Sequence, residues 1–238
     1  MQRRGFIKAC GAGIGCAAMS TQLPKVITEA TASPREYAKV RLVDSGGDPL
    51  RASELKSEQQ WVFAYPFKST PAFLICLNES VDPVDGLLTE NGETYQWPGG
   101  VGAGRCIVAY SAICAHKLAY PTPMLSYISY RPAINGEDRP NGTITCCAEN
   151  SRYDPARGAA VVNGPARQPL ATILLEHDAD TDMLYASGTL GGELFNRFFS
   201  EFSARLDLEY PRGDAQQTVS QDVAAVPLEE YSGNIMGC

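Results

Sequence analysis

The chain has 238 residues and a formal charge of −7 at neutral pH. This acidic balance argues against a nucleic-acid partner, because binding to phosphates requires clustered lysine and arginine. The length allows one domain with a well-buried core. The 22 glycines and 16 prolines are spread along the chain, which predicts many turns and short strands.

The first residues differ in character from the rest. Arg3 and Arg4 precede a weakly apolar stretch that ends near Ala18, a pattern that resembles a twin-arginine export signal. The stretch is shorter than the roughly 20 residues that a membrane-spanning helix needs. We expect residues 1–23 to be an export signal or an uncleaved anchor, and residues 24–36 a polar linker. The protein is therefore expected in the periplasm, attached to the inner membrane if the signal is retained. An ordinary basic helix is the alternative.

Short segments rich in β-branched and aromatic residues predict strands. A glycine-rich loop is expected over residues 91–104, and a turn-rich insert over residues 133–142. The predicted strands cover residues 37–44, 61–67, 72–78, 105–112, 124–132 and 142–147, and three more lie within residues 158–188.

Residues 191–208 break the strand pattern. Their apolar side chains recur at helical spacing, which predicts an amphipathic helix. We expect its apolar face to pack on the core, with binding to a partner protein as the alternative. The tail, residues 211–238, is polar and irregular, and we expect it to lie as an arm over a partner. The apolar residues of the helix are Leu194, Phe195, Phe198, Phe199, Phe202 and Leu206.

Eight cysteines are present, two of them in the leader. Cys76 and Cys106 lie in apolar strands, where a cysteine usually serves as a small buried hydrophobic side chain. Cys238 ends the chain and is expected to be a free, mobile thiol. The remaining three are Cys114, Cys146 and Cys147.

These three cysteines and one histidine have the form of a metal site built from two loops. Cys114 and His116 form a Cys-x-His pair, and Cys146-Cys147 begins a polar turn further along the chain. Cys-x-His on one loop with Cys-x-x-His on another is the ligand pattern of a Rieske [2Fe–2S] centre, in which two histidines replace two cysteines on one iron.

Residues 97–190 resemble a Rieske iron–sulfur domain. The resemblance implies an all-β, Rieske-type antiparallel β sandwich over residues 37–210, with the cluster-binding loops within residues 105–167. The segments that carry it are VGAGRCIVAYSAICAHKLAYP, CCAENSRYDPARGA and VVNGPARQPL.

Two alignments of the second loop remain possible. The closest branch of exported Rieske proteins has Cys-Cys-x-x-His-Ser-x-Tyr-Asp-Pro, which makes Cys147 the thiolate and puts Asn150 in place of the second histidine. The commoner loop makes Cys146 the thiolate and puts Glu149 there. From the closest branch we expect a cluster held by Cys114, His116, Cys147 and Asn150, with Cys146 and Glu149 as the alternative register.

Other positions of the family pattern are partly kept. Ser151 and Tyr153 match hydroxyl donors to a cluster sulfur and a ligand thiolate, and Pro165 matches the loop that shields the cluster from water. The family's disulfide between the two loops would fall near Ala119 and Ala148, so that bond is absent. His177 lies outside the pattern, and we expect it to be a structural side chain.

The resemblance implies an electron-transfer subunit of a redox complex. It would pass single electrons from a quinol or a partner cofactor to a cytochrome-like acceptor. The sequence shows no nucleophile–base set, so we do not expect a stand-alone catalyst. Two alternatives are a Rieske-fold interaction subunit that has lost its cluster, and a zinc site of three cysteines and one histidine. The zinc ligands would be Cys114, His116, Cys146 and Cys147.

Overall fold

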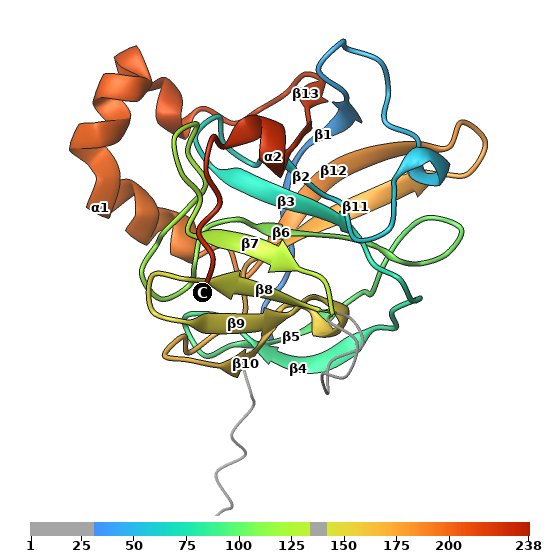
Figure 1. Cartoon of the computed structure of the whole chain (residues 1–238), viewed down its shortest axis with the longest axis horizontal. Coiled ribbons are helices and arrows are strands. Elements are labelled where there is room, and N and C mark those ends of the chain that lie inside the picture. The colour runs from blue at the N-terminus through green and yellow to red at the C-terminus, as the bar shows by residue number, and fades with distance from the viewer. Residues whose placement is uncertain (1–30, 134–141) are drawn as a thin grey trace, which may run out of the picture.

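The computed structural model describes residues 31–133 and 142–238 (Figure 1). The predicted export signal lies outside the described residues. Antiparallel β-structure predominates, with one long C-terminal helix, which confirms the predicted all-β class. The strands are β1 (Arg35–Val43), β2 (Gln60–Ala64), β3 (Pro71–Cys76), β4 (Val84–Leu88), β5 (Thr94–Trp97), β6 (Ile107–Ser111), β7 (Ile128–Arg131), β8 (Thr143–Cys146), β9 (Ser151–Asp154), β10 (Ala160–Asn163), β11 (Thr172–Asp178), β12 (Met183–Leu190), β13 (Val223–Ala224) and β14 (Val226–Pro227). The helices are α1 (Leu194–Glu209) and α2 (Leu228–Tyr231), and the 3₁₀ segments are η1 (Ala52–Glu54), η2 (Pro155–Arg157) and η3 (Pro211–Gln216).

The largest sheet has the order β13-β1-β12-β11-β6-β3-β2-β14. Its two edges approach each other, because β13 pairs with β1 and β14 pairs with β2, and only Ala225 separates β13 from β14. The Ala225 N–H donates to the Val43 carbonyl at 2.8 Å. Part of the tail at 211–238 therefore closes this chain's own sheet, which differs from the irregular arm expected from its polar sequence.

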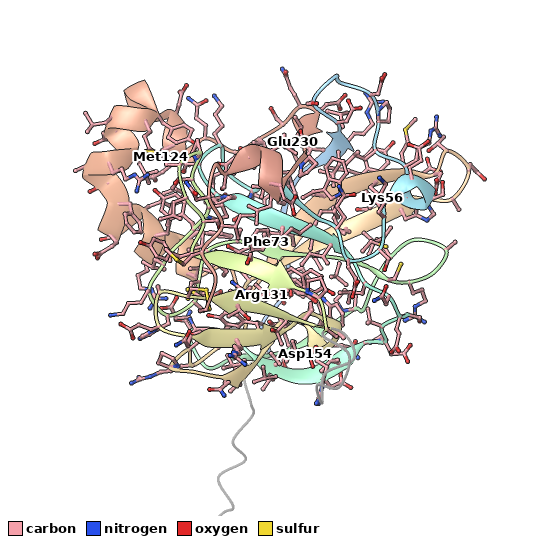
Figure 2. All side chains as sticks on the ribbon, viewed as in Figure 1. Lys56, Phe73, Met124, Arg131, Asp154 and Glu230 are labelled. Atoms are coloured by element: carbon pink, nitrogen blue, oxygen red, sulfur yellow. A yellow bond between two sulfur atoms is a disulfide. The ribbon has the colours of Figure 1, made fainter. Side chains whose placement is uncertain are left out.

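A second sheet, β10-β9-β8-β7, lies beside β3 and β6 and carries the second cysteine motif (Figure 1). Gln60 on β2 joins the two sheets: its side chain accepts from the Tyr130 N–H at 2.7 Å and donates to the Tyr130 carbonyl at 3.2 Å. Phe73, at the centre of Figure 2, belongs to the apolar cluster shared by the two sheets. The large side chains of this cluster also include Trp97, Tyr110 and Tyr153, which are all almost fully buried.

The hairpin β4–β5 was not predicted. Residues 94–97 fall within the segment expected to be a glycine-rich loop, yet they pair with β4 in antiparallel register. Tyr95 and Trp97 are buried while Gln96 is exposed, the alternation of a strand with one face on the core. The neighbouring glycines and proline favoured a loop prediction, and the alternation was too short to override it.

Helix α1 confirms the predicted amphipathic helix and its packing on the core. Phe195, Phe198 and Phe199 are buried together with Ile113 and Leu118, which lie in the segment after β6. The helix ends where the Tyr210 N–H donates to the Leu206 carbonyl, and Pro211 follows, since proline cannot continue a helix. Helix α1 thus supports the first cysteine motif. None of the helices in the described ranges has the length and apolar character to cross a membrane.

Cys76 and Cys106 are brought together by the pairing of β3 with β6. Cys76 is buried, as predicted, but Cys106 is only half-buried. Their sulfurs lie 3.3 Å apart. The two thiols therefore contact each other and do not act as two independent buried hydrophobic side chains.

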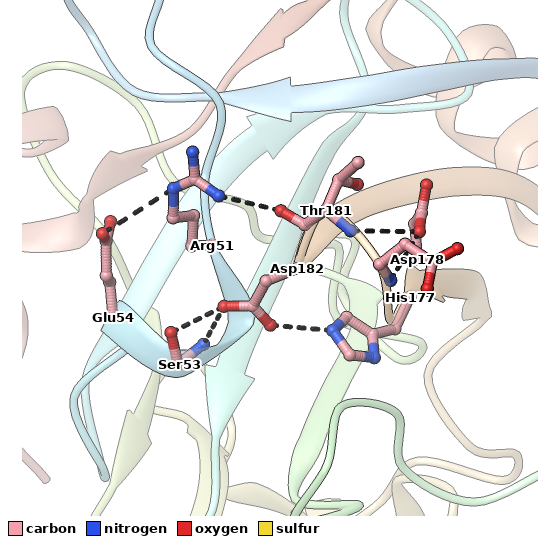
Figure 3. A network of polar contacts seen from close by, with 8 residues as sticks. Arg51, Ser53, Glu54, His177, Asp178, Thr181 and Asp182 are labelled. Carbon is pink, nitrogen blue, oxygen red and sulfur yellow. Dashed lines mark hydrogen bonds and ion pairs between the residues drawn. The ribbon is translucent and has the colours of Figure 1, made fainter.

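His177 takes part in a polar network between η1 and the hairpin β11–β12 (Figure 3). The Asp182 carboxylate accepts hydrogen bonds from the Ser53 hydroxyl at 2.6 Å and the Ser53 N–H at 3.0 Å, and it lies 2.8 Å from His177 Nε2. The Ser53 bonds, followed by His177, hold the pKa of Asp182 at about 2. This arrangement agrees with a structural role for His177.

We expect Asp182→Asn to lower the free energy of unfolding at neutral pH and to lose that effect in acid. A carboxyl group whose folded-state pKa is depressed adds stability above its unfolded pKa, about 3.9, and loses it as the pH falls through the folded value. Urea unfolding measures the difference in the free energy of unfolding between variant and parent. This difference should be constant near neutral pH and should shrink between about pH 4 and pH 2. Ser53→Ala, which removes one donor, should keep part of this pH dependence. A gap that does not change with pH would contradict the role of Asp182.

Candidate metal centre

The first cysteine motif lies in a tight loop directly after β6. The Cys114 N–H donates to the Ala119 carbonyl at 2.9 Å, and the Leu118 N–H donates back to the Cys114 carbonyl at 2.9 Å. Arg197 on α1 holds the outside of the loop through a 2.5 Å hydrogen bond to the Ala115 carbonyl. Cys114 is buried and His116 is half-buried at the loop surface.

The second motif lies in the turn between β8 and β9. Cys146 ends β8 and pairs directly with Ser151 at the start of β9, so residues 147–150 form the turn. Asn150 has a φ of 58°, in the left-handed region that asparagine tolerates better than most residues. Its side chain is exposed. The backbone of the turn therefore accounts for an asparagine at this position.

The thiols of Cys114 and Cys146 meet inside the protein. Both residues are 1 % exposed, and their side chains hydrogen-bond to each other. The bond from Cys146 lowers the pKa of Cys114 against the opposing effect of burial, and the Tyr153 hydroxyl lowers it further. The same bond and burial raise the pKa of Cys146. One sulfur from each loop is thus held at a common point.

His116 and Glu149 form a second pair at the surface side of the two loops. Glu149 Oε2 lies 3.5 Å from His116 Nδ1, and Glu149 Oε1 accepts a hydrogen bond from Lys117 at 2.8 Å. The bond from Lys117 lowers the pKa of Glu149. His116 Nδ1 is itself buried and has no hydrogen-bond partner among the residues that the structure describes.

Two hydroxyl groups lie behind the thiols. Tyr153 Oη accepts from the Ala115 N–H at 3.2 Å and contacts Cys114 Sγ at 3.4 Å. Ser151 is 1 % exposed, and its Oγ has no hydrogen-bond partner within the described ranges. A buried hydroxyl without a partner costs free energy. Ser151 therefore offers an unused hydrogen bond to a group placed beside the thiols.

The Gly-Pro loop after β10 touches the second motif through its glycine. An added Cβ on Gly164 would lie 2.5 Å from the Asn150 carbonyl oxygen and 2.6 Å from Ser151 Cα. Pro165, which the sequence assigned to a shielding loop, is exposed. The contact between the loop and the turn is thus made by backbone and requires glycine at position 164.

Cys147 is bonded to Cys238 in a disulfide, drawn in yellow in Figure 2. This corrects two expectations. Cys238 is not a free thiol, and Cys147 has no thiolate to give to a metal, so the alignment that paired Cys147 with Asn150 and the zinc site of three cysteines both lose a ligand. The sulfur pairing favours the other alignment, with Cys146 and Glu149. An even number of cysteines in a chain expected to be exported was the sequence signal for a disulfide.

The four polar side chains of the two loops are arranged as two pairs, Cys114 with Cys146 and His116 with Glu149. They do not surround one point: over residues 31–133 and 142–238, no three or more His, Cys, Asp or Glu side chains are grouped to hold a single metal ion. The structure thus brings one cysteine of each loop together, and Cys146 is the member of the cysteine pair that faces inward.

No family model matches the chain. Among solved structures, the chain is similar to a Rieske domain. This is the soluble domain of the Rieske protein II (soxF) from Sulfolobus acidocaldarius, with a TM-score of 0.46, 23% sequence identity, and coverage of 64% of this chain and 78% of that chain. A likeness at this level concerns the fold alone.

We expect Tyr153→Phe to lower the free energy of unfolding by about 1–3 kcal/mol, because the buried Ala115 N–H loses its acceptor. Urea unfolding of the purified chain measures this loss. Tyr127→Phe is the matched control, since Tyr127 is 40% exposed. Equal effects for the two substitutions would show that the Tyr153 hydroxyl does not support the first loop.

Proposed function

We propose that the chain is a Rieske-type electron-transfer protein that holds a [2Fe–2S] cluster through Cys114, Cys146, His116 and Glu149. In this assignment the two buried cysteines would hold one iron, and the imidazole and the carboxylate would hold the other. The bound cluster supplies the one-electron redox step. The chain's own residues supply ligation, burial and hydrogen bonds.

The observation that carries the proposal is the pairing of the four side chains. A two-iron cluster needs two ligands for each iron, so its ligands come in pairs and not as one ring. His116 Nδ1 and Ser151 Oγ support the same assignment, because each is a buried polar atom that makes no hydrogen bond within the described residues. A carboxylate is an acceptable oxygen ligand for iron, whereas the Asn150 amide is a weak neutral donor on the exposed side of the turn.

A location outside the cytoplasm belongs to this proposal. The Cys147–Cys238 disulfide supports it, because structural disulfides persist in oxidising compartments such as the bacterial periplasm. The proposed partners are the other subunits of a redox complex, with a quinol or partner cofactor as donor and a cytochrome-like acceptor. The leader at residues 1–23 is proposed to direct export and to attach the chain to the inner membrane if it is retained.

Iron and acid-labile sulfide analysis of the freshly purified chain tests the proposal. We expect about two irons and two sulfides for each chain. Cys114→Ser should abolish both, while Cys76→Ser, which alters a buried thiol away from the two loops, should leave both unchanged. A chain without iron and sulfide would refute the cluster and favour an interaction subunit. Zinc without sulfide would refute the iron assignment.

A further inference from the structure

The last seven residues, 232–238, form a segment that we call the C-terminal strap. Its first half follows the chain that leaves the first cysteine motif. The Ser232 hydroxyl donates to the Thr122 carbonyl at 2.7 Å, and the Gly233 N–H donates to the Pro123 carbonyl at 2.9 Å. Ser126 then both donates to the Asn234 carbonyl and accepts from the Met236 N–H. The strap is therefore fixed along residues 122–126, a few residues beyond His116.

The second half of the strap reaches the other motif. Cys238 is bonded to Cys147, the first residue of the turn after Cys146. Arg131 on β7 donates to the Met236 carbonyl at 2.6 Å and also contacts Cys147 Sγ at 3.4 Å. Figure 1 shows the C-terminus beside the end of β8. One short segment thus contacts the extensions of both loops that carry the candidate ligands.

We propose that the C-terminal strap is a covalent clamp that keeps the second loop in register with the first. The proposal rests on the proposed function for its effect on a cluster. The disulfide joins the second turn to the strap, and the hydrogen bonds of the strap to residues 122–126 extend this constraint toward the first loop. Cys147 and Cys238 are positioning residues in this role: they act on Cys146 through the turn and do not touch the metal.

The clamp has a clear mechanical basis. Cys147 is adjacent to Cys146, so motion of the turn moves the inward-facing thiol. The Cys147 N–H also donates to the Tyr127 carbonyl at 2.7 Å, which ties the turn to the residue just before β7. With Cys238 released, the turn keeps this hydrogen bond, the contact with Arg131 and a 3.3 Å contact between Cys147 Sγ and the Met236 carbonyl, but it loses its covalent link to the strap. The disulfide joins residues that lie 91 positions apart in the sequence. A cross-link over such a distance strongly reduces the conformational freedom of the unfolded chain.

The test compares Cys147→Ser, Cys238→Ser and the double variant in the full chain, with Cys106→Ser as a control distant from the strap. Iron release to a chelator should become about tenfold faster in all three strap variants and stay unchanged in the control. Equal effects of the two single substitutions support the clamp, because each removes the same bond. A much larger effect of Cys147→Ser would overturn it, since that is the result expected if Cys147 were a metal ligand.

A second readout is independent of the metal. Hydrogen exchange of the Ser126 and Cys147 amides in the iron-free chain should be faster in Cys238→Ser than in the parent. Opening the disulfide of the unaltered protein with a phosphine reductant should reproduce this change if a variant fails to fold. If neither the parent nor Cys238→Ser binds iron but amide exchange is faster in the variant, the clamp is supported and the proposed function is refuted. Unchanged exchange and unchanged iron release would overturn the clamp.

Discussion

Gly164→Ala is expected to lower the free energy of unfolding by roughly 2–4 kcal/mol, the sum of backbone strain and steric overlap. Gly164 has a φ of 90°, which an L-residue adopts at a cost of about 1–2 kcal/mol. Its added Cβ would also overlap the Asn150 carbonyl oxygen and Ser151 Cα, and neither atom belongs to a flexible side-chain end. Urea unfolding of the purified chain measures the sum of both effects.

Gly47 provides a matched control for this substitution. It has the same φ of 90°, but nothing lies within 4 Å of the position that its Cβ would take. Gly47→Ala should therefore cost only the backbone strain, about 1–2 kcal/mol. The difference between the two variants isolates the contact between the Gly-Pro loop and the second motif. Equal losses would mean that this loop does not press on the turn.

The same substitution should disturb the candidate centre. Relief of the overlap has to displace the start of β9, because Ser151 Cα lies against Gly164. Ser151 and Cys146 are direct partners in the β8–β9 pair, so the inward thiol shifts with it. We therefore expect Gly164→Ala to weaken iron retention as well as stability, while Gly47→Ala leaves retention unchanged.

The sequence predicted the two loops and most of the strands because these features depend on local patterns. It favoured Cys147 over Cys146, although the strand pattern pointed to Cys146. In β8, successive side chains point to opposite faces, and Ile144 is fully buried. Cys146 shares the face of Ile144, which turns Cys147 away from the thiol of Cys114. The alternation of side chains along the strand therefore predicts Cys146 as the inward-facing cysteine, whereas the gapless alignment predicted Cys147.

Local sequence patterns do not predict the C-terminal strap or the closure of the large sheet. Val223, Val226 and Cys238 lie in a polar tail, and each finds a partner more than 85 residues away in sequence, which no spacing rule predicts. The tail is held by short strand pairs, hydrogen bonds, one disulfide and a few scattered buried side chains such as Leu228. Most of these interactions leave little trace in the hydrophobicity pattern, so the packing of the tail against the rest of the same chain could not be predicted from it.

Glu149→His is expected to convert the candidate centre into one with two histidine ligands. Glu149 faces His116 at 3.5 Å, so a histidine there replaces the carboxylate at the same iron. Visible circular dichroism and electron paramagnetic resonance should then show the signals of a two-histidine centre. Asn150→His is the matched control: its side chain is exposed on a left-handed residue, and the spectrum should stay that of the parent.

The pH dependence of the reduction potential gives a second measure of the same substitution. An imidazole bound to the iron that changes its charge can lose a proton on oxidation, so each such imidazole couples one proton to the electron. The parent has only His116, and its potential should fall by at most about 59 mV per pH unit, the slope for one proton and one electron. Glu149→His should approach about twice that slope over the range where both imidazoles ionise. A two-proton slope in the parent, or a steeper slope in Asn150→His than in Glu149→His, would contradict the assignment of Glu149 as the fourth ligand.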